Sequence, residues 1–359
     1  MRADDGLFEP EGRASFNPAD FGGLEKKEEW KYAHLEEVCG FAEAFEPSNS
    51  SRVLLNGSDA PEGEAEKLLT PRDRVEAAGF SSVGRAFPIR MPEGKSEIKV
   101  VNEGPRDAVF LSLDFGEGGK SDALLSFEGA GEGVYFLDVK AGEGSEASLT
   151  VLCRGGGKKF VYDSTRIARD AKAKRNLVCL GGEFVRYSSG AYFAGPGGEA
   201  EMNGVYFSSG KNYIECRVRV AHAVPGCKSR VSYRGALLGA EARSAWVGES
   251  IIGKGGQGSD SYELNKNFVL TPGAKSFSEP QLEIKNGDIL SAGHSSSVGY
   301  FDPDQLFYLR SRGIGEEEAK KMIISGFFDE LLLQMGSEEA EREFKDFCRK
   351  AGVRDGAQA

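Results

Sequence analysis

Short apolar runs alternate with glycine-containing breaks through the middle of the chain. Between about residues 84 and 290, the runs have strand length and alternate apolar with polar positions, while Gly, Ser, Asn and Asp stand at the breaks. No segment of helical period interrupts this series, so a fold of alternating strands and helices is not expected. The clearest runs are 97–101, 108–115, 133–139, 147–153, 176–180, 204–207, 213–220 and 229–233.

This pattern predicts a mainly β core. A sandwich, a barrel and a β-solenoid are all compatible with so many short strands and frequent turns. Glycine makes up 48 of the 359 residues, about twice the usual share of roughly 7%. The runs are uneven in length and their glycines stand at corners, which favours the stacked coils of a solenoid, although no strict repeat period is visible.

The two ends of the chain have a different pattern. Residues 1–80 are acidic and mixed, with a helical patch at 36–45 and a segment at 47–63 that is typical of a loop. We therefore expect a mixed helical and loop region at 1–82, a β core at 83–300 and a helical region at 301–359.

The C-terminal region shows clear helix signals. Asp302 is a good N-cap, Pro303 suits the first helical position, Gln305 stands where a capping box has Glu or Gln, and Gly313 ends the helix. A longer helix is predicted from residue 316. Its expected apolar face is Ala319, Met322, Ile323, Phe327 and Leu331, and a last helix at 338–350 carries Phe344, Phe347 and Cys348 on one face.

Charge and hydropathy narrow the class of protein. The net charge of −11 argues against general nucleic-acid binding, because phosphate affinity needs clustered Lys and Arg. We interpret the basic stretch at 158–175 as a solvated face or a loop. No apolar run approaches the roughly 20 residues that span a bilayer, and the first residues lack the apolar core of a signal peptide. We therefore expect a cytoplasmic protein that binds neither nucleic acid nor membrane.

Motifs of known chemistry are missing from the sequence. The glycine-rich stretches 155–159 and 253–258 lack the spacing of a phosphate-binding loop and are predicted to be turns. The six cysteines form no C-x-x-C pair, so we expect neither a zinc knuckle nor a disulfide framework, and Cys153, Cys179 and Cys216 are predicted to be core residues. An enzyme with convergent carboxylates stays possible, but no pair is singled out.

The chain has three histidines, His34, His222 and His294. A lone histidine is more often a hydrogen-bonded structural residue than a ligand. His222 precedes a Pro-Gly turn. His294 stands among small residues between a strand-like segment and the capped helix, so its imidazole is predicted to be available to a partner surface.

Residues 278–299 (SEPQLEIKNGDILSAGHSSSVG) and 304–314 (DQLFYLRSRGI) closely resemble the C-terminal signature of the SufB/SufD family, the scaffold proteins of the SUF system for iron–sulfur cluster assembly. The resemblance covers about residues 200–330. Further matching segments are 202–204, 222–225, 229–235, 246–248 and 259–267, and near the start only Glu-Glu-Trp-Lys-Tyr at 28–32 is similar.

The resemblance implies a right-handed parallel β-helix flanked by helical regions. It also implies that SufB and SufD subunits pair, and that the C-terminal helices dock the ABC-type ATPase SufC. On this basis the chain itself would be a scaffold and not an enzyme. The residues expected to contact SufC are Asp302, Gln305, Leu306, Phe307, Tyr308, Arg310, Arg312, Gly313, Phe327 and Phe328, although for the two phenylalanines a plain core position is the alternative.

Two positions favour a SufD-like over a SufB-like chain. SufB carries a cysteine near the position of Ala274 and tends to have a Glu after the signature histidine, where this chain has Ser295. Ala292 stands where some SufD proteins have cysteine, so a further potential ligand is missing. His294 keeps the place of the signature histidine. The resemblance implies that His294 is a ligand of a nascent cluster or iron, shared transiently with a partner, or a hydrogen-bonding interface residue. The alternatives are a SufB-type homodimer that binds the cluster itself and a β-helix carbohydrate-active enzyme.

Overall fold

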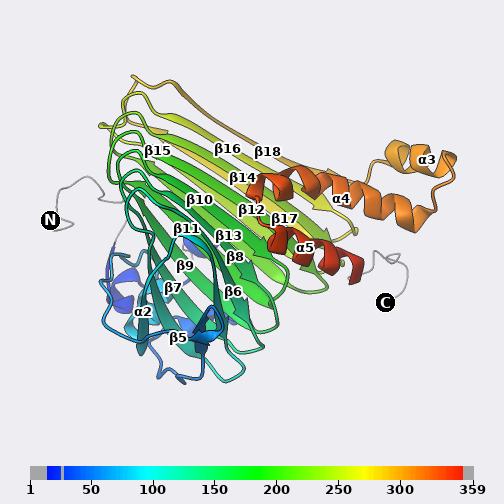
Figure 1. The fold of residues 1–359 in the computed structure, drawn as a ribbon. Coiled ribbons are helices and arrows are strands. Elements are labelled where there is room, and N and C mark those ends of the chain that lie inside the picture. Colours follow the sequence, from blue (N-terminus) through cyan, green and yellow to red (C-terminus); the bar gives the residue numbers. More distant parts are fainter. Residues whose placement is uncertain (1–13, 26–27, 351–359) are drawn as a thin grey trace.

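The structure is a computed structural model, and it describes residues 14–25 and 28–350. Sixteen strands, β3 to β18, form eight coils of two strands each, with one strand of every coil in each of two parallel sheets (Figure 1). The predicted mainly β solenoid with flanking helices is therefore confirmed. Sandwich and barrel are excluded because consecutive strands lie in different sheets, and each strand pairs in parallel with the strand two places along the chain.

Sheet A and sheet B contain alternate strands. Sheet A contains β4 (Gly94–Val101), β6 (Lys120–Glu128), β8 (Glu146–Cys153), β10 (Lys172–Cys179), β12 (Glu199–Ser209), β14 (Lys228–Leu238), β16 (Asp260–Val269) and β18 (Ser291–Tyr300), and the hairpin β1 (Arg52–Leu55) and β2 (Ser58–Asp59) extends it antiparallel beyond β4. Sheet B contains β3 (Arg85–Arg90), β5 (Asp107–Asp114), β7 (Gly133–Ala141), β9 (Lys158–Ile167), β11 (Phe184–Phe193), β13 (Tyr213–His222), β15 (Arg243–Ile252) and β17 (Lys275–Ile284).

The space between the two sheets is the lumen of the solenoid, and it holds the largest apolar core. Strand register aligns equivalent positions of successive coils into columns, because parallel strands place paired residues on the same face. One lumen column of sheet A changes from apolar to polar residues along the chain. It runs Ile98, Leu125, Val151, Leu177, Gly204, Tyr233, Asn265 and Ser296.

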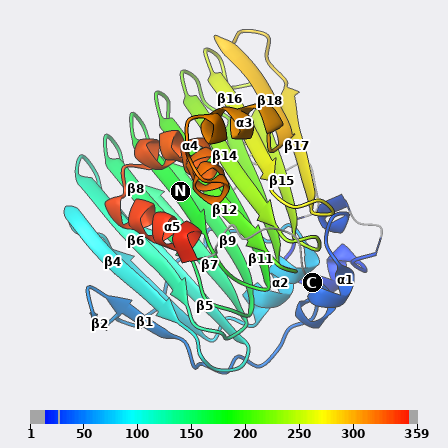
Figure 2. The same cartoon turned by 90° about the vertical axis from the view of Figure 1, so that its right-hand side faces the viewer.

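Segments from the two ends of the chain cover the outer faces of the sheets (Figure 2). The N-terminal segment packs on sheet B, where Phe160, Phe184 and Tyr213 stack at ring distances of 5.3 and 5.0 Å. Its helices are η1 (Pro18–Phe21), η2 (Glu28–Trp30), α1 (Leu35–Val38), η3 (Cys39–Phe41) and α2 (Arg74–Ser81). Helices α4 (Glu316–Met335) and α5 (Glu338–Lys350) pack on sheet A, and α3 (Pro303–Ser311) contacts α4 and projects away from the sheets (Figure 1).

The segment predicted to be a loop at 47–63 is instead partly a hairpin. Asn56 and Gly57 form its turn with φ of 49° and 82°, and Asn-Gly is the dipeptide that favours such a two-residue turn. The prediction was wrong because it weighed the polar composition of the segment over this turn signal. The helical patch predicted at 36–45 is present only as the short α1 and η3.

Two further expectations need correction. The basic stretch at 158–175 belongs largely to strands β9 and β10, and Lys159 and Arg175 are buried rather than solvated. In α4, Met322 is exposed, and the buried face is Ala319, Ile324, Phe328, Leu331, Leu332 and Met335. In both cases the buried side of the element is the side that packs against neighbouring elements, and the local sequence pattern does not determine which side that is.

The predicted α3 and α5 are confirmed. Asp302 caps α3 by accepting a hydrogen bond from the backbone of Asp304 at 2.9 Å. Phe344 is buried in α5, with Phe347 and Cys348 packed beside it. Of the two glycine-rich stretches expected to be turns, 253–258 contains turns, whereas 155–159 is a bend at 155–157 followed by the first residues of β9. No helix within the described residues is long and apolar enough to cross a membrane.

Candidate functional site at the open end of the solenoid

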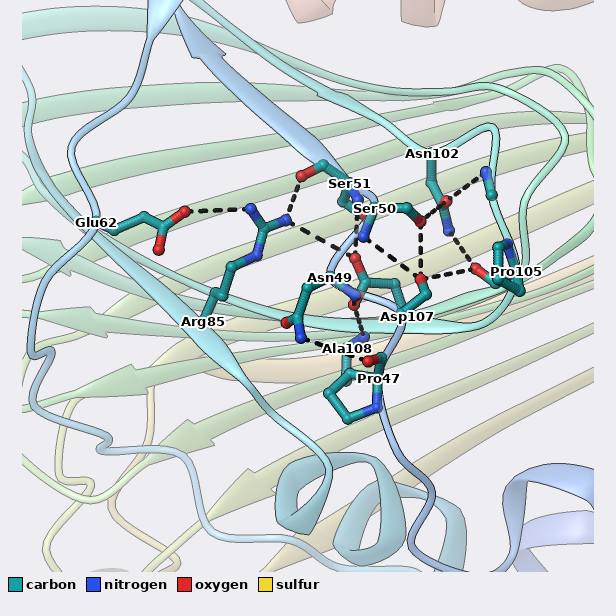
Figure 3. A network of polar contacts seen from close by, with 12 residues as sticks. Pro47, Asn49, Ser50, Ser51, Glu62, Arg85, Asn102, Pro105, Asp107 and Ala108 are labelled. Atoms are coloured by element: carbon teal, nitrogen blue, oxygen red, sulfur yellow. Dashed lines mark hydrogen bonds and ion pairs between the residues drawn. The ribbon is translucent and has the colours of Figure 1, made fainter.

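The N-terminal end of the solenoid is closed by the chain itself. Figure 3 shows how residues 47–51 are held across the first coils by the buried carboxylate of Asp107. This carboxylate accepts hydrogen bonds from the backbone N–H groups of Asn49 at 3.1 Å and Ser51 at 2.9 Å, and it lies 3.8 Å from the guanidinium of Arg85. The segment between residues 47 and 51 therefore acts as a cap of the first coils.

The C-terminal end of the solenoid is open. Strands β17 and β18 form the last coil, and each is the outermost strand of its sheet. Among the described residues, none of those in these two strands is buried. Large apolar side chains of this coil are exposed, including Leu290 (78%), Tyr300 (69%) and Val298 (41%). An exposed edge with apolar side chains is a template for pairing with another chain.

His294 lies on β18 at this open end and is exposed. It pairs in register with Glu263 of β16, which in turn pairs with Val231 of β14. Paired residues of parallel strands project from the same face of a sheet, so His294 belongs to a lumen column. The sequence predicted its availability, but it did not predict that the imidazole is the last member of a column that begins inside the solenoid.

Glu263 is the buried neighbour of His294 and was missed at the level of sequence. Its side chain is 1% exposed, and both carboxylate oxygens are buried without a hydrogen-bond partner. Burial, and to a lesser extent the nearby carboxylate of Glu249, raises the pKa of Glu263 to about 8. The signal that could have identified Glu263 is the period-two spacing of Ser261, Glu263 and Asn265, which puts the carboxyl on the lumen face.

Gly248 makes room for the Glu263 carboxyl. A methyl group at Gly248 would stand 2.8 Å from Oε2 of Glu263 and 2.2 Å from the ring of Trp246. The indole Nε1 of Trp246 is also buried without a partner. Two unpaired polar groups therefore lie in the same layer, directly below the open coil.

Serine and asparagine side chains line the rest of this end of the lumen. Ser250 and Ser261 share a hydrogen bond of 2.6 Å, and Ser278 of β17 donates to Oδ1 of Asn265 at 2.8 Å. Their hydrogen-bonding groups satisfy one another, unlike the carboxyl of Glu263. The polar lining therefore continues to the mouth of the solenoid, where His294 stands.

The site is not a complete metal centre within this chain. Across residues 14–25 and 28–350, no three His, Cys, Asp or Glu side chains are grouped so as to hold a metal ion. Cys153, Cys179 and Cys216 are fully buried in the lumen, as expected for core residues. Ala274 lies in the turn before β17, so the last coil carries no thiolate.

His222 has a structural environment. It is buried at the end of β13, its Nε2 lies 2.9 Å from the hydroxyl of Ser229, and its ring packs 4.8 Å from Phe193. Burial lowers the pKa of His222 to about 4. The imidazole is therefore neutral at physiological pH and belongs to the packing of the lumen.

The helical residues proposed for docking fall into two groups. Within α3 no residue is buried, and Phe307 and Tyr308 are 73% and 56% exposed. Asp302, Gln305, Arg310, Arg312 and Gly313 are likewise exposed, and Leu306 is half-buried. Phe328, however, is fully buried between α4 and sheet A, and Phe327 packs partly against Phe268. Phe328 is thus a core residue of this chain and offers no contact surface.

The N-terminal segment at 28–32 reaches the open coil across sheet B. Trp30 is buried with the guanidinium of Arg186 3.6 Å from its ring. Tyr32 stacks on Phe277 of β17 at 4.7 Å and donates a hydrogen bond of 2.7 Å to Glu279. This segment therefore braces β17 from the outer face.

Comparison with known proteins agrees with this architecture. Residues 114–327 match the family described as SUF system FeS cluster assembly, SufBD core domain. An iron–sulfur cluster assembly SufBD family protein of Mycobacterium bovis is 46% identical over 164 residues, which cover 44% of this chain and 41% of that protein.

Two more distant relatives match a similar length of this chain. A second SufBD family protein of Mycobacterium bovis is 26% identical over 149 residues, or 42% of this chain and 17% of that protein. The iron–sulfur cluster assembly protein SufD of Escherichia coli is 27% identical over 150 residues, or 42% of this chain and 35% of that protein. The match thus spans at most about two fifths of the length of these three relatives.

Proposed function

The chain belongs to the SufBD family of iron–sulfur cluster assembly proteins, and we propose that it is a SufD-like scaffold subunit that acts in a complex. It pairs with a SufB-like paralogue through the open end of its solenoid and docks a SufC-like ABC ATPase through its C-terminal helices. The chain itself performs no catalysis in this proposal, and ATP hydrolysis belongs to the SufC-like partner.

The observation that carries this proposal is the contrast between the closed and the open end. Residues 47–51 cap the first coil, whereas the last coil presents exposed apolar side chains on two edge strands. Edge strands of soluble proteins are normally covered or blunted. β17 contains Pro280, whereas β18 contains no proline over Ser291–Tyr300. Because proline cannot donate a backbone hydrogen bond, β18 is the better pairing edge.

His294 stands on that edge and supports a role with iron or a nascent cluster, which is cargo of the complex. Neutral imidazole is a suitable ligand for iron, and histidine replaces cysteine at one iron of Rieske clusters. One imidazole is too few ligands for a cluster. In this proposal the SufB-like partner provides the thiolates, and the cluster is held only transiently across the interface.

Helix α3 and the start of α4 support the docking of an ATPase. Phe307 and Tyr308 expose aromatic rings on a helix without buried residues of its own. Arg310 pairs with Glu316 at 3.2 Å and so connects α3 to the first turn of α4. Aromatic and arginine side chains are the ones that most often contribute binding energy in interfaces.

Co-purification of the full chain with candidate SufB-like and SufC-like proteins tests the proposal. We expect all three chains to assemble. The His294→Ala variant is expected to keep the assembly and lose cluster formation, whereas Phe307→Ala is expected to release the ATPase alone. Cluster formation that is unchanged in His294→Ala would remove the chemical role of this residue.

A second experiment distinguishes a SufB-type homodimer, which could use the same open edge. The purified chain is incubated anaerobically with iron and sulfide in the absence of partners. We expect no stable visible chromophore, because the last coil carries no thiolate. A stable chromophore on the isolated chain would overturn the SufD-like assignment.

A further inference from the structure

Glu263 and His294 form a pair at the mouth of the lumen, and we propose that together they bind a divalent transition-metal ion, ferrous iron in the cell. This inference rests on the proposed function, because it assigns to the His294 site a second ligand from the same chain. It adds that the second ligand of the iron is a carboxylate, which lies one strand deeper in the solenoid than the imidazole.

Strand register places the two residues side by side on sheet A. Glu263 and His294 are direct partners in the parallel pairing of β16 and β18, and adjacent strands lie about 4.8 Å apart. Both side chains leave the same face of sheet A, since the alternation of a strand is the same for paired residues. A carboxylate and an imidazole on this spacing can reach one ion between them.

The lumen direction of Glu263 is established by its contacts. Its Oε2 approaches Gly248 of the opposite sheet, next to the ring of Trp246, which belongs to the main lumen core. Ser261, two residues earlier on the same strand, bonds across the lumen to Ser250. His294 therefore closes the column directly above a carboxyl that points into the solenoid.

The unpartnered state of Glu263 indicates a missing ligand. Both oxygens are buried and accept no hydrogen bond, and leaving such a group unpaired costs free energy. Other buried polar side chains of this layer, such as Asn265 and Ser250, have partners. The charged neighbours on the outer face do not form an ion pair with Glu263. Glu249 is itself an acid, and it pairs with Arg219 at 3.1 Å.

The donor set selects the class of ligand. A carboxylate and a neutral imidazole together suit borderline divalent ions such as Fe²⁺, Co²⁺ and Zn²⁺, whereas a hard cation such as Ca²⁺ requires oxygen ligands alone. Two side chains leave the remaining coordination positions to water and, in the assembled complex, to the partner. An ion that is held this incompletely is exchangeable, as cargo has to be.

Metal titration of the purified full chain tests the pair, with Co²⁺ as the probe because its visible absorption reports ligand geometry. We expect a single saturable site in the wild-type protein. Glu263→Gln and His294→Ala are each expected to weaken Co²⁺ binding by about tenfold or more, since each removes a direct ligand. Glu283→Gln, which removes an acid on the outer face of β17 that pairs with Lys285 at 3.0 Å, is the matched control and is expected to bind Co²⁺ as the wild type does.

The outcomes separate this inference from the proposed function. Wild-type affinity in Glu263→Gln would overturn the pair, even if His294→Ala still blocked cluster formation in the complex. Loss of Co²⁺ binding in Glu263→Gln supports the pair, and it does so whether or not the chain co-purifies with its partners. Circular dichroism and thermal unfolding of each variant exclude misfolding, and His294→Ala changes only an exposed side chain. If His294→Ala alone bound Co²⁺ normally, the pair would also be overturned.

Discussion

The two ends of the solenoid are built from the same coil but present opposite surfaces. At the first coils, Val100 is buried in the lumen and the segment at 47–51 lies across the edge. At the last coil, Val298 occupies the same register column and is 41% exposed. A repeated coil has to end somewhere, and an end without its own cap requires a partner or a polar surface. The chain solves this problem internally at one end only.

The lumen differs between the two ends in the same way. Near the cap its side chains are aliphatic and aromatic, whereas toward the open end serine, asparagine, Glu263 and His294 replace them. Buried polar groups cost free energy unless they are paired. Their concentration at the open end therefore points to interactions that the isolated chain does not complete.

Substitutions at Val100 and Val298, which share one register column, give the largest expected difference in the free energy of unfolding. Val100→Asp puts a charge into the closed lumen and is expected to lower the free energy of unfolding by about 4 kcal/mol. Val298→Asp is expected to change it by less than about 0.5 kcal/mol, because the side chain is exposed. Urea unfolding of both variants measures the difference, and equal losses would contradict the contrast between the ends.

Removal of the cap contact comes next. Asp107→Ala leaves buried backbone N–H groups of Asn49 and Ser51 without an acceptor and is expected to cost about 3 kcal/mol. The control is Asp114→Ala at the other end of the same strand, where the exposed carboxylate accepts one hydrogen bond from Gly116 at 2.9 Å. That variant is expected to lose less than about 1 kcal/mol in the same urea measurement. Similar losses for the two aspartates would show that the cap adds nothing.

Lowering the pH is expected to destabilise the folded chain, because His222 is buried in the polar half of the lumen. Burial lowers the pKa of His222 from 6.5 to about 4, so the unfolded chain binds a proton in this range while the folded chain does not. Stability is therefore unaffected by His222 above pH 6.5 and falls as the pH drops toward 4, by about 3 kcal/mol. His222→Gln is expected to remove this part of the pH dependence in thermal unfolding, whereas His34→Gln keeps it. A wild-type pH profile in His222→Gln would refute the assignment.

The smallest expected effect concerns the brace on β17. Tyr32→Phe removes the hydrogen bond to Glu279 while a phenyl ring keeps the stack on Phe277, and the expected cost is about 1 kcal/mol. Hydrogen exchange should accelerate in β17 and stay unchanged in β5. Tyr308→Phe on the exposed α3 is the control and is expected to leave exchange in β17 unchanged. Unchanged exchange in β17 of Tyr32→Phe would show that the open coil needs no brace.

The strand pattern was readable along the chain because it depends on local alternation. Runs such as 133–139 and 213–220 lie within observed strands β7 and β13. The hairpin at Asn56 and Gly57 was missed although its turn signal is local. The buried face of α4 was displaced toward Ile324 and Phe328 because the choice between apolar faces depends on the sheet beneath.

The amino-acid sequence was enough to predict the β core and the N-cap at Asp302, and it carried the family resemblance that pointed to His294. These features depend on residues close together in the chain. The three-dimensional fold was needed to show which end of the solenoid is closed and that Glu263 lies unpaired below His294. Register across 31 residues of chain makes these two residues neighbours on adjacent strands, and no local pattern encodes this pairing, because it depends on how each coil stacks on the coil before it.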